Sequence, residues 1–233
     1  KNCIGFDVSE RVRIIPASIR VIREKRKKYC CKSCEGLRAG ESGVVRAEGK
    51  KHLVAGSIAD ESLLAWSVTE KFEFALPFYR QEKRLGYIGI HIPRATLSGL
   101  AILSAEKCGP LYEGLKEHVR SGKLINADET RLQVLKEPGR KAQDLSWMWI
   151  FRGGGPERPA VVFEYSTGRS SDVPVKFFRG FSGWLQTDDY EAYHTALRRL
   201  REPPDPGGGI RHVLCWAHVR QYFVRTWETT RSE

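Results

Sequence analysis

Two short stretches of the chain each end an apolar run in a pair of carboxylates. The first pair is Asp128 and Glu129, and the second is Asp188 and Asp189. Short apolar runs bounded by polar residues predict strands, so both pairs are expected at strand ends. Carboxylate oxygens are ligands that Mg²⁺ and Mn²⁺ prefer, and such ions can activate a hydroxyl that attacks a phosphodiester. The pattern predicts the metal-binding part of a nuclease-like site, although acids after strands also serve as turn residues and helix caps.

Two cysteine motifs offer further metal ligands. The six cysteines are irregularly spaced and no secretory signal precedes them, so a disulfide framework is not expected. Cys31 and Cys34 have the C-x-x-C spacing of zinc thiolates, but a structural site uses four ligands, so this is a half-site. Two ordinary thiols in a basic loop remain the alternative. Cys215 and His218 also have a ligand-like spacing; packing is the commoner role, but a histidine beside carboxylates could orient water or a phosphate.

The charge of the chain favours a polyanionic partner. The formal net charge is +11 over 233 residues, and residues 10–51 hold 13 Lys or Arg against 5 Glu. Such an excess is typical of proteins that bind nucleic acid, although a merely basic soluble surface is the alternative. The densest run supplies these candidate DNA contacts: Arg23, Lys25, Arg26, Lys27 and Lys28. No apolar run approaches the roughly 18 residues that span a bilayer, so a cytoplasmic protein without a membrane partner is expected.

The elements that must position these residues differ between the two halves of the chain. In the first half we expect short strands at Val12–Ile15 and Ile19–Ile22, a linker over 36–56, and helices beginning near Ser57, Pro77, Pro93 and Pro110. The apolar spacing predicts buried stripes at Leu64, Val68 and Phe72 and at Leu97, Leu100, Ala101, Ser104 and Cys108. Short helices with basic residues near their turns fit a helix-turn-helix DNA reader and a plain helical bundle equally well.

The second half predicts a mixed α/β sheet. Strands are expected at 124–127, 147–151, 159–165, 183–187 and 211–214, with helices at 172–179, 190–201 and from Trp216 onward. The first three strands form a meander, and each of the last two follows a helix. This is the order of a ribonuclease-H-like sheet. In that topology the first strand is central and the fourth lies beside it. Asp128 and Asp188 are therefore expected to converge.

Five motifs, in this order, carry a resemblance to a known family. They are Tyr29–Gly36 (YCCKSCEG), Leu76–Gln81 (LPFYRQ), Ala127–Thr130 (ADET), Leu185–Tyr190 (LQTDDY) with Tyr193, and Cys215–Arg220 (CWAHVR). Together they cover nearly the whole chain, which resembles transposases of the insertion sequence 66 family, a group of bacterial Asp-Asp-Glu transposases. The resemblance implies DNA cleavage and strand transfer with Mg²⁺ or Mn²⁺, and zinc bound by an N-terminal module.

The resemblance also implies roles for single residues. It makes Asp128 the first catalytic aspartate and metal ligand and Asp188 the second, because position 189 is usually glycine in the family. Glu129 is then a neighbour rather than a ligand, Cys31 and Cys34 match the second half of the zinc module, and the family's first cysteine pair would precede Lys1. His218 and Arg220 are auxiliary candidates in the last motif.

The expected organisation has three parts. They are a basic, partial zinc-finger-like module at 1–50, a helical and DNA-binding region at 51–121, and a ribonuclease-H-like catalytic domain at 122–233 that lacks its C-terminal part. The family's catalytic glutamate lies well beyond the last motif, so an incomplete fragment, inactive or poorly active, is expected. The implied partners are transposon-end and target DNA, accessory transposition proteins and further copies in a homo-oligomer. A non-enzymatic DNA-binding module or regulator is the alternative.

Overall fold

Two compact units make up the chain, residues 1–55 and residues 56–233. The structure is a computed structural model and describes residues 9–13, 18–30, 44–201 and 209–231. In the first unit β1 (Lys28–Cys30) and β2 (Val44–Arg46) pair antiparallel and are exposed along their whole length. Among the described residues, no helix is both long and apolar enough to cross a membrane.

One strand prediction in the first unit is wrong. Residues 18–27 have no regular secondary structure, so Ile19–Ile22 is not a strand, and Val21 and Ile22 are 87% and 70% exposed. Among the described residues of this unit the segment has neither a paired strand nor a core to enter, and a strand gains its stability from paired neighbours and a buried face. Of the other expected strand, Val12–Ile15, the last two residues lie outside the described residues.

Three helices begin the second unit: α1 (Glu61–Phe72), α2 (Phe78–Tyr87) and α3 (Arg94–Lys107). The first begins at Asp60 and not at the expected Ser57, because the Asp60 Oδ1 atom accepts hydrogen bonds from the backbone N–H groups of Ser62 and Leu63, both at 3.1 Å. Such a cap satisfies donors that the first turn leaves unpaired. Ser57 instead closes a short turn by accepting from the Ala59 N–H at 2.9 Å.

The stripes predicted for these helices are only partly correct. In α1, Leu64 is buried but Phe72 is 72% exposed, and the second buried position is the polar Ser67. The Ser67 hydroxyl donates to Gln81 Oε1 at 2.6 Å, and the Gln81 amide donates to the Ser67 carbonyl at 3.0 Å, so a polar pair joins α1 to α2. In α3 the predicted stripe buries its leucines and Ser104 but leaves Cys108 exposed.

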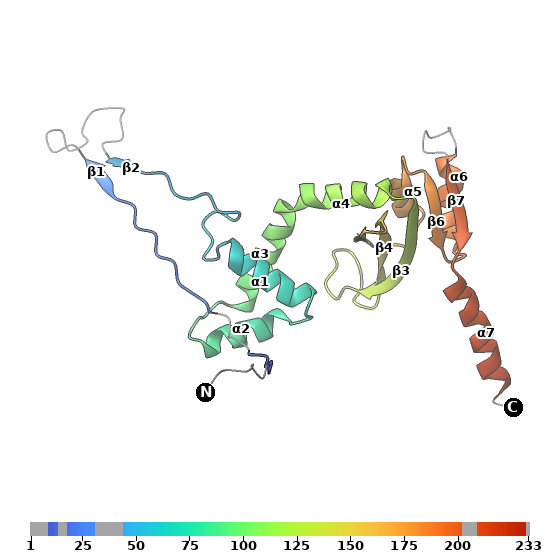
Figure 1. Ribbon diagram of the computed structural model, residues 1–233, viewed down its shortest axis with the longest axis horizontal. Helices are drawn as coiled ribbons and strands as arrows, with labels where there is room; N and C mark the ends of the chain where they lie inside the picture. The colour runs from blue at the N-terminus through green and yellow to red at the C-terminus, as the bar shows by residue number, and fades with distance from the viewer. Residues whose placement is uncertain (1–8, 14–17, 31–43, 202–208, 232–233) are drawn as a thin grey trace, which may run out of the picture. The chain divides into compact units, whose positions relative to one another are not determined.

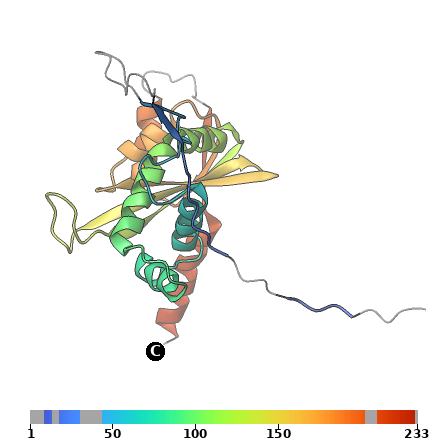
Figure 2. The ribbon, with the colours of Figure 1, turned by 90° about the vertical axis from the view of Figure 1, so that its left-hand side faces the viewer.

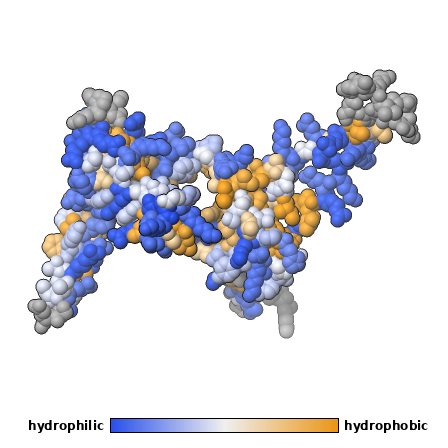
Figure 3. Space-filling view, turned by 180° about the vertical axis from the view of Figure 1, so that it is seen from behind, coloured by the Kyte–Doolittle hydropathy of each residue, from blue (hydrophilic) through white to orange (hydrophobic). Residues whose placement is uncertain are grey.

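Apolar surface remains open to solvent on this helical part of the unit. Figure 3 shows hydrophobic side chains gathered over the helices on the side of the molecule that it draws. The large exposed apolar residues of this part include Phe72, Phe74, Ile88, Ile102 and Leu103. The core that the helices enclose is small, built on Leu85, Ile92 and Leu97 with partly buried neighbours, so it cannot take in the remaining apolar side chains.

The rest of the unit confirms the predicted mixed α/β architecture. Five strands lie in the order β5-β4-β3-β6-β7, with β3 central (Figure 1). Their bounds are β3 Leu124–Gln133, β4 Leu145–Gly155, β5 Arg158–Ser166, β6 Gly183–Thr187 and β7 Ile210–Leu214. The first three are antiparallel neighbours, and β6 and β7 run parallel to β3. The helices are α4 Gly109–Ser121, α5 Asp172–Phe178, α6 Glu191–Leu200 and α7 Trp216–Thr230.

One face of this sheet packs against helices. Alternate residues of the central strands enter a core with residues of α4, α5 and α6; Ile125, Trp149, Phe151 and Leu185 are fully buried there. Helix α4 lies so close to β4 that a Cβ atom on Gly153 would be only 2.5 Å from the Val119 carbonyl oxygen. Figure 2 shows the long strands of the sheet from a second direction.

The residues of opposite parity form the second face. It carries large side chains that stay open to solvent, namely Leu124, Val161, Phe163, Tyr165 and Trp184. Asp128 belongs to this face as well and is exposed. A sheet residue and its neighbour in sequence point to opposite sides, so Glu129 lies on the core face.

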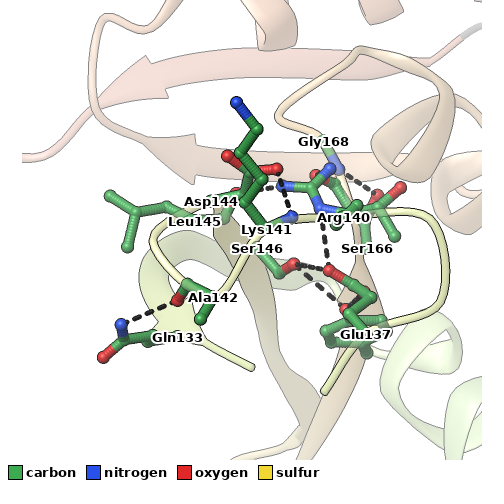
Figure 4. A network of polar contacts seen from close by, with 12 residues as sticks. Gln133, Glu137, Arg140, Lys141, Ala142, Asp144, Leu145, Ser146, Ser166 and Gly168 are labelled. Carbon is green, nitrogen blue, oxygen red and sulfur yellow. Dashed lines mark hydrogen bonds and ion pairs between the residues drawn. The ribbon is translucent and has the colours of Figure 1, made fainter. Parts of the chain in front are cut away.

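The loop between β3 and β4 is held by a polar network at the end of the sheet. Glu137 accepts a hydrogen bond from the Ser146 hydroxyl at 2.8 Å and one from the Tyr165 hydroxyl. Arg140 forms an ion pair with Glu137 at 2.8 Å and donates to the carbonyls of Thr167 and Leu145 (Figure 4). The network anchors an eleven-residue connection that has no regular structure of its own.

Candidate active site

The first element of the site is the pair of adjacent parallel strands β3 and β6. Their register sets Leu124 beside Trp184 and Asn126 beside Gln186. The Asn126 side-chain amide donates to Gln186 Oε1 at 2.6 Å, so these two side chains point to the same face. Two residues further along the chain, on that face, come Asp128 within β3 and Asp188 directly after the end of β6. The two adjacent strands therefore carry both carboxylates on one face, but Asp128 is not at the strand end that the sequence predicts, because β3 continues to Gln133.

Each of these carboxylates is oriented by a backbone N–H. The Oδ1 atom of Asp128 accepts from the N–H of Glu129 at 2.9 Å, and that of Asp188 accepts from the N–H of Tyr190 at 3.1 Å. Because charge-assisted hydrogen bonds fix direction, both side chains are held on the face of the sheet where a hard cation could contact them.

Glu129 has a different environment from its neighbour. Its side chain is completely buried and forms an ion pair with Arg169. The hydroxyl of Tyr193, on α6, donates to the second carboxylate oxygen at 2.6 Å. Burial, together with the nearby Glu129 carboxylate, raises the pKa of Tyr193, which therefore stays protonated as a donor. Glu129 is thus fully engaged inside the core.

Asp189 also separates from Asp188. It is exposed, and its Oδ1 atom lies 2.8 Å from Nε2 of His194, whose ring contacts that of His212 at 5.1 Å. Burial, with His194 nearby, lowers the pKa of His212, and its Nε2 atom lies 2.8 Å from the Thr187 hydroxyl. Asp189, His194 and His212 line an open depression of about 560 Å³ beside α6.

The last motif brings a histidine toward the carboxylates. His218 lies in the first turn of α7, and hydrogen bonding with Cys215 raises the pKa of His218, an effect to which Asp128 and Asp188 add. Hydrogen bonding with His218 lowers the pKa of the Cys215 thiol. His218 and Asp188 line a second, smaller hollow of about 80 Å³. The other auxiliary candidate, Arg220, is exposed on α7.

The N-terminal candidates belong to the first unit. Cys31 and Cys34 lie outside the described residues. Arg23, Lys25, Arg26, Lys27 and Lys28 are all exposed, and only the last belongs to a strand. Within the parts of the chain that the structure describes, no group of three or more His, Cys, Asp or Glu side chains is arranged to hold a metal ion.

Residues 56–233 match the family model described as the IS66 family of transposases, and residues 1–35 match the zinc-finger binding domain of transposase IS66. The chain belongs to the IS66 transposase family. Cys31 and Cys34 fall within the zinc-finger match, and both aspartates of the strand pair fall within the transposase match. The family match supports a function related to transposition.

Three proteins of Sinorhizobium fredii are similar to this IS66-family chain. It is 35% identical to y4jD, 33% to y4qI and 25% to y4hP, in each case over 94% or more of its own length. The chain spans only about four tenths of the length of these curated relatives, 38% to 44%. A chain of a simian T-cell lymphotropic virus intasome, solved in complex with a regulatory subunit of PP2A, is 13% identical, with a TM-score of 0.29 over 40% of this chain and 32% of that one.

Sequence reasoning missed one prominent feature of the site. Arg169, from the loop between β5 and α5, joins Glu129 to the aromatic rings of Tyr190 and Trp147. Nothing in the local sequence, Thr167-Gly-Arg-Ser170, distinguishes this arginine from other loop arginines. Only the buried position of Glu129, which requires a cationic partner, could have pointed to it.

Proposed function

We propose that this chain carries the two-aspartate part of a metal-dependent site for DNA cleavage and strand transfer, on a ribonuclease-H-like sheet. The observation that carries the proposal is the register of β3 and β6, with its hydrogen bond between Asn126 and Gln186. Continued by two positions, that register would bring Asp128 and Asp188 next to one another, although sixty positions separate them in sequence. Adjacent strands lie roughly 4.8 Å apart, a spacing at which two carboxylates can share one cation.

The donor chemistry of this pair suits Mg²⁺ or Mn²⁺. Both residues offer hard carboxylate oxygens, and no thiolate belongs to the proposed pair. When bound, such an ion would supply Lewis-acid activation of water, or of a DNA 3′-hydroxyl, and would stabilise the leaving oxygen. Asp128 and Asp188 would hold it, and His218, which lines a hollow with Asp188, would act on the same phosphate as an auxiliary group.

Two carboxylates alone make a weak site for these ions. A Mg²⁺ site needs further ligands or substrate phosphates, and the described residues supply no third side chain. We therefore propose that this chain by itself binds a single ion weakly and cleaves DNA poorly or not at all. Glu129 does not enter this site, because it is paired inside the core.

The DNA-binding contribution is proposed for the exposed basic run from Arg23 to Lys28. Next to it, Cys31 and Cys34 would form the second half of a zinc site, as the zinc-finger family match supports. In this organisation residues 1–50 form the basic module, residues 51–121 the helical region and residues 122–233 the sheet domain. Transposon ends and target DNA would be the substrates, with accessory proteins and further copies as partners.

Manganese binding tests the proposed site directly. Isothermal titration of the full chain with Mn²⁺ is expected to show a single weak site that Asp128→Asn and Asp188→Asn each abolish. Asp189→Asn is the matched control, because this exposed neighbour is oriented toward His194. Manganese binding that persists in Asp128→Asn would show the proposal to be wrong. Robust Mn²⁺-dependent nicking of supercoiled DNA, lost in the same variant, would overturn the expected low activity.

A non-enzymatic DNA-binding module is the second candidate, favoured by the full exposure of the basic run. Replacing Arg23, Lys25 and Lys27 with alanine in the full chain should weaken DNA binding at every sequence tested. It should also reduce the slope of log K against log salt by about 1 for each phosphate that the chain no longer neutralises. Alanine at Lys136 and Lys141, on the β3–β4 loop, removes charge elsewhere and serves as control. Strong DNA binding without Mn²⁺ binding would favour this candidate over the first.

A further inference from the structure

Arg169 lies partly buried on the core side of the sheet, on the face opposite to Asp128. Its Nε atom donates to the Oε1 atom of Glu129 at 2.8 Å, and its Nη2 atom contacts the same oxygen. The guanidinium carbon lies 3.5 Å from the ring centre of Tyr190 and 4.6 Å from that of Trp147. A planar guanidinium can stack on rings and donate in its own plane at once, which an ammonium group cannot do.

The contacts of Arg169 extend to both aspartates through the backbone. On one side is Glu129, whose N–H donates to Asp128. On the other is Tyr190, whose N–H donates to Asp188 and whose hydroxyl donates back to the Arg169 carbonyl at 2.9 Å. The two residues that Arg169 holds are therefore the same two that orient the two carboxylates.

We propose that Arg169 is a positioning residue that fixes the Asp128 and Asp188 carboxylates relative to one another. The inference rests on the proposed function of that pair. Glu129 lies within β3 and Tyr190 is the residue before α6, so one arginine side chain contacts both segments and adds to the hydrogen bond that Tyr193 of α6 donates to Glu129. A buried carboxylate has to be paired, so Glu129 cannot turn away without great cost.

The Tyr193 hydroxyl completes the arrangement from α6. It donates to the Glu129 oxygen that Arg169 does not contact, so both carboxylate oxygens are held from different elements. The ring of Tyr193 in turn packs edge-on against those of Trp149 and Tyr190. Rotation of Glu129 would therefore disturb the sheet, the helix and the loop at once, and its backbone N–H keeps a constant direction toward Asp128.

The variant that tests this role is Arg169→Lys, which keeps the positive charge but loses the planar group. The matched control is Arg140→Lys in the loop network of Figure 4. Side-chain exposures of the two Arg–Glu pairs are comparable, 32% and 0% for Arg169 with Glu129 against 27% and 9% for Arg140 with Glu137. The control network contacts neither aspartate. Both variants are made in the full 233-residue chain.

Two measurements are made on each variant. Amide hydrogen exchange, followed residue by residue by NMR without metal, reports the N–H groups of Glu129 and Tyr190. Titration with Mn²⁺ alone reports the carboxylate pair. In Arg169→Lys we expect both amides to exchange at least tenfold faster while the core amides of Ile125 and Leu185 stay protected. Manganese affinity should fall about 10- to 100-fold, the usual effect of removing a group that orients metal ligands. Arg140→Lys should change neither measurement.

The outcomes separate this inference from the proposed function. Unchanged exchange at either amide in Arg169→Lys would overturn the positioning role, and so would equal acceleration across the whole sheet, which would make Arg169 a stability residue only. If the wild-type chain binds no Mn²⁺, the proposed metal site fails, while the two amides still decide whether Arg169 orients the aspartates. Normal Mn²⁺ affinity in Arg169→Lys, beside its loss in Asp128→Asn, would also reject the positioning role.

Discussion

Replacing Tyr193 with phenylalanine removes one oxygen atom from the interior and leaves the ring in place. In the native protein that hydroxyl lies 2.6 Å from a carboxylate oxygen of Glu129, and both side chains are closed to solvent. The edge-on contacts of the ring with Trp149 and Tyr190 do not involve the hydroxyl, so they survive the change. The variant therefore isolates a single hydrogen bond to a buried charge.

The loss of stability in Tyr193→Phe is set by the hydrogen bond that Glu129 no longer accepts. Hydrogen bonds to charged groups contribute about 1.5–3 kcal/mol, and a buried acceptor left unpaired loses its desolvation compensation as well. For a domain of 150–250 residues each kcal/mol changes the melting temperature by about 2–4 °C. We therefore expect Tyr193→Phe to lower the free energy of unfolding by about 1.5–3 kcal/mol and the melting temperature by about 3–12 °C.

Thermal and urea unfolding, followed by tryptophan fluorescence and circular dichroism, measure both quantities. Tyr222→Phe is the control, because Tyr222 is 68% exposed on α7. Exposed substitutions of this kind usually change stability by less than about 0.5 kcal/mol. A Tyr193→Phe chain within about 0.5 kcal/mol of wild type, the size of the control effect, would refute the description of Glu129 as a buried carboxylate that depends on this hydroxyl.

Alkaline pH adds an independent check on the same residue. The pKa of Tyr193 is raised in the folded protein above its ordinary value of 10.0, by burial and then by Glu129. Above pH 10 the unfolded chain releases this proton while the folded chain keeps it, so stability is present below that pH and declines as the pH rises beyond it. In Tyr193→Phe the stability should decline less steeply as the pH rises above 10. Tyr112, whose pKa burial also raises, keeps part of the slope in the variant.

Three further predictions concern other parts of the second unit. Gly153→Ala should destabilise the fold by about 1–3 kcal/mol, measured by urea unfolding, because its Cβ would meet the Val119 carbonyl at 2.5 Å; the same change at Gly155, which has open space, should cost less. In the same assay, Gln81→Ala should lower the free energy of unfolding by about 1–3 kcal/mol, because the hydroxyl and the carbonyl of Ser67 would lose buried hydrogen-bond partners. Its control, Arg84→Ala, breaks a surface ion pair and should lower it by less than about 1 kcal/mol. Because burial lowers the pKa of His212 below 6.5, its contribution to stability should fall as the pH drops below 6.5, and His212→Gln should flatten that acid limb in a pH series of melting curves.

The strand order could be predicted because each strand of the sheet carries its own signal. Short apolar runs stand between turn residues, and the last two strands each follow a helix, which makes those strands parallel. The same reasoning failed at Ile19–Ile22, an apolar run that pairs with no strand among the residues that the structure describes. Local pattern predicts a strand only where the fold also supplies its neighbours.

The predicted start of the first helix was wrong for a different reason. Ser57 and Asp60 are both good capping residues, and sequence alone does not say which N–H groups are left to be capped. The structure gives that role to Asp60, three residues nearer to Leu64. Phe72 was placed on the buried face by its spacing, yet α1 ends there and its last turn stays exposed. Periodicity describes the middle of a helix better than its ends.

The strongest signal that the sequence prediction did not use was the alternation of residues along β3, which puts Asp128 and Glu129 on opposite faces of the sheet. Ile125 and Ala127 are apolar, so the period of two already assigns Glu129 to the same face and Asp128 to the opposite one. The carboxylates of β3 therefore divide before any tertiary contact is known: one must be neutralised in the core, and the other is free for chemistry at the surface. What parity cannot give is the neutralising partner, because Arg169 comes from a loop forty positions away. Catalytic acids are recognised by position along a strand, but the groups that hold them in place become visible only once the chain is folded.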